Sequence, residues 1–224
     1  MQLEIVSNHE PEIVPELRSL AARIGRLGPQ VEATSPVSVR DYLALSRPEQ
    51  EKVRKNIDAL DEVLLCFGEG QADTRRAAKR ALDKYKMRVR DEDIDLIMQD
   101  DVVEMYSIDG LQIFRNLEFF NYCRYSLLEV MMYEWFALYE RASFVEKDLH
   151  QWQVDVLKGA TSKKCFFGEN FMRERLLADK RLYAIQFKYL IPLFDQVGDE
   201  IQGLMLTSSG TPVTDIDVSN LRFI

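Results

Sequence analysis

The sequence is poor in cysteine, and this shortage excludes two classes of protein. Three cysteines, Cys66, Cys123 and Cys165, occur in 224 residues. Their number is odd and no two have CxxC spacing, so neither a disulfide framework nor a thiolate zinc site is expected. We therefore expect reduced thiols and a cytoplasmic protein.

The chain also lacks long apolar runs. None approaches the length of a membrane span, and the first residues, MQLEIVSNHEPE, lack the basic and apolar regions of a signal peptide. We expect no membrane partner.

Positive charge is in deficit, with 29 Lys and Arg against 37 Asp and Glu and a formal net charge of −8. A duplex nucleic-acid binder needs clustered Lys and Arg, so nucleic acid is not expected as a partner. One stretch, residues 75–90, is basic, and Arg75, Arg76, Lys79 and Arg80 fall on one helix face. A solvated face is the favoured interpretation. A partner surface, or a nucleic-acid-binding regulator that uses this helix, stays an alternative.

Catalytic and cofactor motifs are missing as well. The sequence has no GxSxG, GxxxxGK[ST] or GxGxxG, and its acidic groups at 91–93 and 100–101 have no EF-hand pattern. We interpret both acidic groups as solvated. No enzyme activity and no metal site are expected.

The first hundred residues predict mostly helices. Apolar residues recur at helical spacing from Leu17 to Leu27, before Gly28-Pro29. Ser46 and Glu49 form a capping box for a helix that Gly68 and Gly70 end. Further helices are predicted over 73–89 and 91–98, and residues 33–39 are predicted to be a loop.

The second half begins with a predicted hairpin, Val102–Ser107 and Leu111–Arg115, because Asp109-Gly110 suits a type I′ turn. Asn116 is expected to cap a short helix. Capping boxes follow at Ser126/Glu129 and Ser143/Glu146, and Gly159 ends the longer helix. Residues 182–191 then alternate with period two, which predicts a strand with Tyr183, Ile185, Phe187, Tyr189 and Ile191 on one face. A turn at 195–199 leads to a strand at 201–208, and Cys165–Phe167 is a weaker strand candidate.

This order of elements resembles a PAS domain over roughly residues 98–217. VEMYSIDGLQIFRN (103–116) resembles the family's opening hairpin, YSLLEV (125–130) its Gly-Tyr-Ser-x-Glu-Glu-Leu segment, and residues 191–214 its closing strands. The resemblance implies an α+β fold: a five-stranded antiparallel sheet with helices on one face and a small cavity between them. We expect a helical N-terminal region, residues 1–97, for dimerisation or signal transmission, followed by a PAS-like domain, residues 98–224.

Six aromatic side chains are candidates for lining that cavity, although a packed core explains them equally well. They are Phe120, Tyr125, Trp135, Trp152, Phe187 and Tyr189. His150 lies about 130° from the apolar face of its helix, which disfavours a haem ligand. Cys123 matches the flavin-reactive segment of PAS relatives poorly. No cofactor is expected.

The resemblance implies a sensory or regulatory signalling protein. A small ligand or a partner would bind the sheet half, the protein would be a homodimer, and a downstream signalling protein would act in trans. A ligand-free dimerisation or docking adaptor is the alternative.

Overall fold

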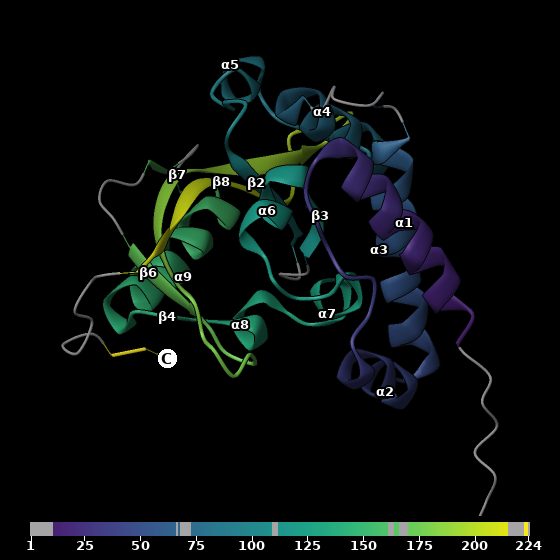
Figure 1. Cartoon of the computed structure of the whole chain (residues 1–224). Helices are drawn as coiled ribbons and strands as arrows, with labels where there is room; N and C mark the ends of the chain where they lie inside the picture. Colours follow the sequence, from purple (N-terminus) through teal and green to yellow (C-terminus); the bar gives the residue numbers. More distant parts are fainter. Residues whose placement is uncertain are drawn as a thin grey trace, which may run out of the picture.

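In the computed structural model, an antiparallel sheet in the second half of the chain curls around two helices, and helices of the first half pack beside it (Figure 1). The two helices inside the curl are α6 (Leu117–Tyr122) and α9 (Ser143–Leu157). The structure describes residues 11–65, 67, 73–108, 112–160, 164–165, 170–214 and 222–223.

Two of the first helices form as predicted. α1 (Ile13–Leu27) buries Leu17, Leu20 and Ile24 and ends at Gly28, whose φ of 130° suits glycine. α3 (Arg47–Leu64) starts with the predicted Ser46–Glu49 capping box. It ends before the predicted stop at residues 68 and 70, which lie outside the described ranges.

The predicted loop at residues 33–39 is wrong, because α2 (Pro36–Ala44) begins inside it. Ser35 caps this helix, and its side chain accepts a hydrogen bond from the Ser38 backbone N–H at 3.1 Å. Pro36 sits in the first turn, where a missing N–H costs nothing. The cap pairs serine with serine, so the usual Ser-x-x-Glu signature of a helix start is absent.

The two predicted helices at 73–89 and 91–98 are both shorter than expected. α4 (Thr74–Tyr85) stops because Lys86 adopts a left-handed conformation with φ 58°. Residues beyond it form β1 (Met87–Arg88), which pairs with the end of the long strand β7 (Leu182–Asp195). α5 is one turn, Asp91–Ile94. Tertiary pairing at Met87 and Arg88 thus overrides the helical periodicity that predicted a helix as far as Val89.

The sheet confirms the α+β class and has a PAS-like layout, in which the opening hairpin lies beside the last strand. Its hairpin strands are β2 (Val102–Ser107) and β3 (Gln112–Arg115), and its later strands are β6 (Asn170–Glu174), β7 and β8 (Ile201–Val213). The strand order is β3-β2-β8-β7-β6-β4, with β4 at Tyr139–Arg141. The first and last strands of the region therefore meet in the middle of the sheet.

The third predicted strand falls in a different place. Lys164–Cys165 forms the two-residue β5, which pairs with β7, and the longer strand next to β7 is β6. Short β1, β4 and β5 enlarge the sheet beyond the five strands that the resemblance implied. Residues 166–169 lie outside the described ranges.

A β-bulge in β7 divides its predicted apolar face in two. Phe187 pairs with Ser208, whereas Tyr189 pairs with Thr207, so Lys188 is an extra residue in the strand. Ser208 and Thr207 are neighbours and point to opposite faces, and residues directly opposite each other share a face. Phe187 and Tyr189 therefore lie on opposite faces of the sheet, contrary to the simple alternation.

The helices between the two halves of the sheet are short. α7 (Leu127–Met132) carries the predicted Ser126–Glu129 capping box, and α8 (Trp135–Leu138) is a single turn. α9 starts at Ser143 itself, with Ala142 as its N-cap, and Gly159 follows it with φ 68°. His150 is exposed on α9, as its angle predicted.

Two acidic residues predicted to be solvated are buried instead. Asp93 is 3% exposed and Asp101 fully buried. Asp101 accepts a hydrogen bond from the backbone N–H of Met98 at 2.9 Å and forms an ion pair with Lys188 on the bulge. Asp101, which directly precedes β2, is therefore a buried structural residue and not a solvated one.

α7 and the sheet share one hydrophobic core with α1, α3 and α4. The backbone N–H groups of Leu127 and Leu128 donate to the carbonyls of Glu32 and Ala33, and the Ser35 hydroxyl donates to Glu129 at 3.0 Å. The division of the chain at residue 97 stays a prediction. Among the described residues, no helix has the length and apolarity that crossing a membrane requires.

Candidate ligand-binding site

A small cavity lies between the sheet, α6 and β4. Its volume is about 50 Å³, which is on the order of one or two water molecules. The described residues that line it are Val102, Glu104, Phe119, Tyr122, Tyr139, Arg141, Met172, Ile185, Phe187, Ser208 and Gly210. Five strands and one helix thus converge on a single space.

Opposite charges share the wall of this cavity. Glu104 comes from β2 and is 9% exposed, and Arg141 comes from β4 and is 5% exposed. The Arg141 guanidinium carbon lies 5.2 Å from the centre of the Phe187 ring, a cation–π distance. A ligand in the cavity would therefore meet a carboxylate, a guanidinium and aromatic surface.

Three hydrogen bonds lead from Glu104 out of the cavity. The Gln112 amide donates to Glu104, the Arg115 guanidinium donates to the Gln112 carbonyl oxygen, and the same guanidinium donates to the backbone carbonyl of Val130 on α7. We call Glu104, Gln112 and Arg115 the relay. It connects the cavity to α7, which itself contacts α1, α2 and α3.

Burial controls the ionisation of the groups around the cavity. It raises the pKa of Tyr106 and Tyr139 well above the usual phenol value, so both hydroxyls stay protonated and can donate hydrogen bonds. It also raises the pKa of the Cys123 thiol to about 11. Cys123 is a buried, free cysteine. A protonated thiol is a weak nucleophile, and this environment suits a structural role.

The six predicted aromatics do not gather at one place. Phe187 lines the cavity. Phe120 and Tyr125 are buried in the core, and Trp152 and Tyr189 are half-buried against it. The side chain of Trp135 lies outside the described part of the chain.

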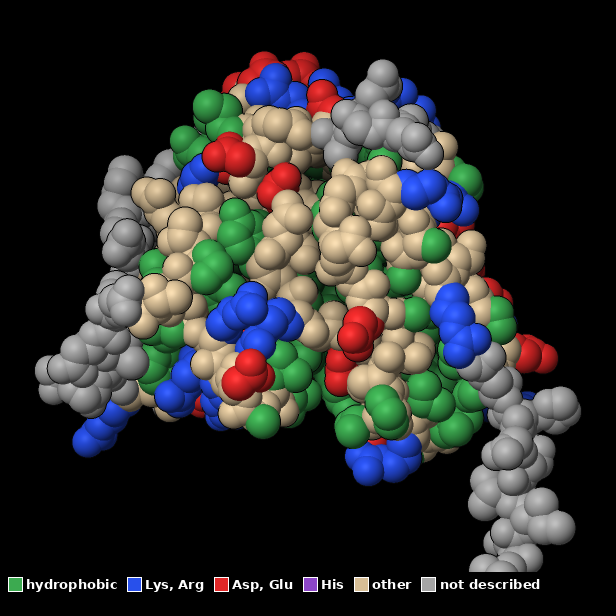
Figure 2. Space-filling model, viewed as in Figure 1, with side chains coloured by type: hydrophobic (Ala, Val, Ile, Leu, Met, Phe, Trp, Pro, Cys, Tyr) green, Lys and Arg blue, Asp and Glu red, His purple; other side chains and the backbone are tan. Residues whose placement is uncertain are grey.

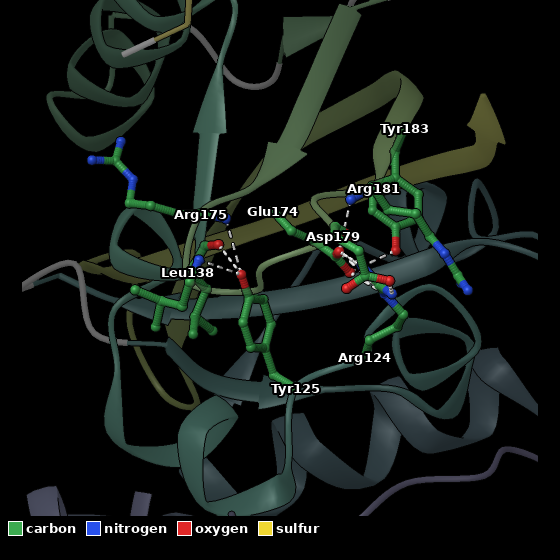
Figure 3. Close-up of polar contacts among 9 residues, drawn as sticks. Arg124, Tyr125, Leu138, Glu174, Arg175, Asp179, Arg181 and Tyr183 are labelled. Carbon is green, nitrogen blue, oxygen red and sulfur yellow. Dashed lines mark hydrogen bonds and ion pairs between the residues drawn. The ribbon is translucent and has the colours of Figure 1, made fainter. Parts of the chain in front are cut away.

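Tyr125 belongs to a polar cluster at the edge of the sheet (Figure 3). Its hydroxyl donates to the Leu138 carbonyl and accepts the backbone N–H of Arg175 at 3.0 Å. Beside it, the fully buried carboxylate of Glu174 forms an ion pair with Arg124 and accepts the Tyr183 hydroxyl at 3.0 Å. This cluster fastens the segment before α7 to the β6–β7 hairpin.

Sequence reasoning missed the charged residues of the cavity. Glu104 had a signal, because it interrupts an apolar strand, VVEMYS, at a position where alternation allows burial. Arg115 ends the next strand. Arg141 had no such signal, since β4 has three residues and forms only through pairing with β6.

The predicted basic surface is divided among different contacts. Arg75 pairs with Asp95 at 3.3 Å and donates to the Ile97 carbonyl, so it joins α4 to the segment that follows α5. Arg76 lies over the ring of Phe67 at 5.8 Å. Lys79 and Arg80 are exposed. Over α4 and α5, at the top of Figure 2, Lys and Arg side chains intermix with Asp and Glu.

No group of three or more His, Cys, Asp or Glu residues that could hold a metal ion occurs in the parts of the chain that the structure describes.

Comparison with known proteins yields a structural likeness at low sequence identity. No model of a known protein family matches the chain, and no curated protein matches it. The chain is similar to the crystal structure of the PAS domain of a protein from Colwellia psychrerythraea, with 14% sequence identity and a TM-score of 0.35. The alignment covers 51% of this chain and 87% of that one. A TM-score this low carries no argument about function.

Proposed function

We propose that this protein is a sensory or regulatory module that binds a small polar ligand in the cavity between α6, β4 and the sheet. The observation that supports the proposal is the buried pair of opposite charges, Glu104 and Arg141, on the wall of an internal space. Pockets that combine apolar walls with a few convergent polar groups are the usual sites of small ligands.

The relay supplies a route from ligand to output. A ligand that bonds to Glu104 competes with the Gln112 amide, and Gln112 in turn holds Arg115 against α7. Ligand binding shifts such a packing only by its different affinity for the two arrangements. We infer that the change reaches the N-terminal helices through α7, and that a separate protein, acting in trans on a homodimer, reads it. No catalysis and no cofactor belong to this proposal.

The test is NMR spectroscopy of the protein, with labelled methionine methyl groups as reporters of ligand binding. Met172 lines the cavity, so a ligand bound there should shift its labelled methyl resonance. The protein is purified without denaturation, and native mass spectrometry shows any small molecule that leaves on unfolding. Ser208→Val narrows the cavity and should abolish both the retained mass and the Met172 shift. Retention of the same molecule by this folded variant would refute the site.

The small volume of the cavity favours a second function, a ligand-free docking adaptor. In that case Ser208→Val binds the partner as well as the wild type does, and no small molecule is retained. Light scattering tests the dimer that both functions include.

A further inference from the structure

A second space lies where the N-terminal helices meet the sheet half, and the proposed sensory function assigns no ligand to it. This junction groove has a volume of about 180 Å³ and lies between α3, β3 and α7. Figure 1 shows α7 next to α2 and α3 at this junction. The residues that matter for its chemistry are Leu45, Val53, Asn56, Arg115, Met131 and Met132.

The groove has a cationic base. Arg115 is 4% exposed, and its guanidinium is held by the Gln112 side chain and the Val130 carbonyl. The Asn56 amide donates to the Gln112 backbone carbonyl at 3.4 Å, which fixes a second N–H donor group nearby. A buried guanidinium held in place before a ligand arrives binds carboxylates well, because its N–H groups match the carboxylate oxygens.

The walls are apolar and adaptable. Val53 is buried, and Met131 and Met132 are half-buried. Methionine side chains adjust to ligands of different shape. An engineered apolar cavity of about 150 Å³ holds benzene, so the groove has room for one aromatic ring or a short aliphatic chain.

The charges at the groove's mouth limit the ligand to one negative charge. Lys52 is exposed there, and so are the carboxylates of Glu49 and Glu134. Glu49 accepts hydrogen bonds from Ser46, which lowers the pKa of its carboxyl and keeps it ionised. A second carboxylate on the ligand would meet these like charges.

We propose that the junction groove binds a small organic monocarboxylate, with its carboxylate at Arg115 and its apolar part against Met131 and Met132. Gln112 and Arg115 line the groove and also belong to the relay, so the two proposed sites share these two side chains. The test therefore uses variants that leave Glu104, Gln112 and Arg115 unchanged.

The probe is benzoate, titrated into full-length protein with labelled methionine methyl groups. We expect saturable shifts at Met131 and Met132, with Met172 of the cavity unmoved. Benzamide, benzylamine and terephthalate should bind much more weakly, because each lacks the single negative charge. Met131→Trp fills the groove and should abolish binding. Lys52→Gln should weaken it about threefold, as for an exposed charge pair.

Lys55→Gln is the matched control, since Lys55 lies on the same helix, pairs with Glu51 and does not line the groove. It should bind benzoate like the wild type. Benzoate shifts at Met172 alone would show that benzoate acts outside the groove and would overturn this inference. Equal binding of benzamide or benzylamine would overturn the ligand class. No saturable binding of benzoate would overturn the site and leave the cavity proposal standing.

Discussion

The sheet contains two buried glutamates, Glu174 and Glu104, whose bonding partners give them different roles. Glu174 is fully buried and is matched by Arg124, by the Tyr183 hydroxyl and by the backbone N–H of Arg181. Glu104 forms side-chain hydrogen bonds with the neutral Gln112 amide and the Tyr106 hydroxyl, lies near the Arg115 guanidinium, and opens onto a cavity. The first carboxylate is fully engaged inside the fold, whereas the second still faces a space that a ligand can enter.

The comparison teaches that burial alone does not identify a functional group. A carboxylate with a matched cation and several hydrogen bonds has little to gain from a ligand. A carboxylate whose hydrogen bonds come from a neutral amide and a hydroxyl can exchange one of them for a ligand group of similar strength. On this ground Glu174 is a structural anchor and Glu104 a candidate contact for ligand.

Removal of the cation beside Glu174 should have the largest effect. Arg124→Met leaves a fully buried carboxylate without its ion-pair partner, and we expect a loss of about 3–5 kcal/mol in the free energy of unfolding. Urea denaturation followed by circular dichroism measures it. Asp179→Asn is the matched control, because Asp179 also contacts Arg124 but is 84% exposed. It should change stability by no more than about 0.5 kcal/mol. Equal losses of unfolding free energy in the two variants would contradict the structural role of the Arg124–Glu174 ion pair.

Removal of an uncharged buried side chain should lower the free energy of unfolding somewhat less than removal of Arg124. Asn116 is the N-cap residue of α6, as predicted, but its side chain forms no capping hydrogen bond. Its amide accepts the Val103 N–H at 3.0 Å and donates to the Asp101 carbonyl at 2.7 Å, so it ties the end of β3 to β2. Asn116→Ala leaves buried backbone groups without partners, and we expect a loss of about 1–3 kcal/mol. The same denaturation experiment measures it. Asn121→Ala, at an exposed position on α6, is the control. If Asn116→Ala lowered the free energy of unfolding more than Arg124→Met does, the ion pair of Glu174 would not be the stronger of the two buried interactions.

Alkaline pH should destabilise the protein through the tyrosines beside the two glutamates. Burial raises the pKa of Tyr106 and of Tyr183, with a further contribution from Glu104 and Glu174 respectively, and burial raises the pKa of Tyr125 to about 12. Unfolded tyrosine ionises near pH 10, so the unfolded state loses protons first. Stability is therefore complete below about pH 10 and falls as the pH rises toward the folded values. Phenolate absorbance and circular dichroism, followed together, check this. Ionisation of every tyrosine near pH 10, with the fold intact, would contradict it.

Replacement of the cavity glutamate should have the smallest effect on stability. Glu104→Gln keeps an oxygen that can accept from Gln112, and Arg115 keeps its own hydrogen bonds to Gln112 and to the Val130 carbonyl. We therefore expect a change within about 1 kcal/mol. Thermal denaturation measures stability, and the Met172 methyl signal reports whether the cavity still takes up any ligand that the wild-type protein retains. A loss of stability as large as that of Arg124→Met would show that Glu104, like Glu174, has a structural role, and would contradict its interpretation as a ligand contact.

The sequence by itself determined the local elements and the class of the fold. Capping residues at Ser46 and Ser126, the stop at Gly28, and the alternation from residue 182 all act within a few residues, and the corresponding elements form. The order of these elements also predicted the α+β class. The loop predicted at residues 33–39 failed because its helix is capped by serine on serine, a weaker local signal.

Only the tertiary structure decided where charges and faces lie. The bulge at Lys188 moves Tyr189 to the other side of the sheet, because a strand's register depends on its neighbour and not on its own sequence. Asp101 is buried because Lys188 reaches it from a strand 87 residues away. The pairing of Glu104 with the relay, and of Arg141 with the cavity, likewise needs strands that meet only when the sheet closes. Partners distant in sequence determined the candidate sites, and local patterns cannot report them.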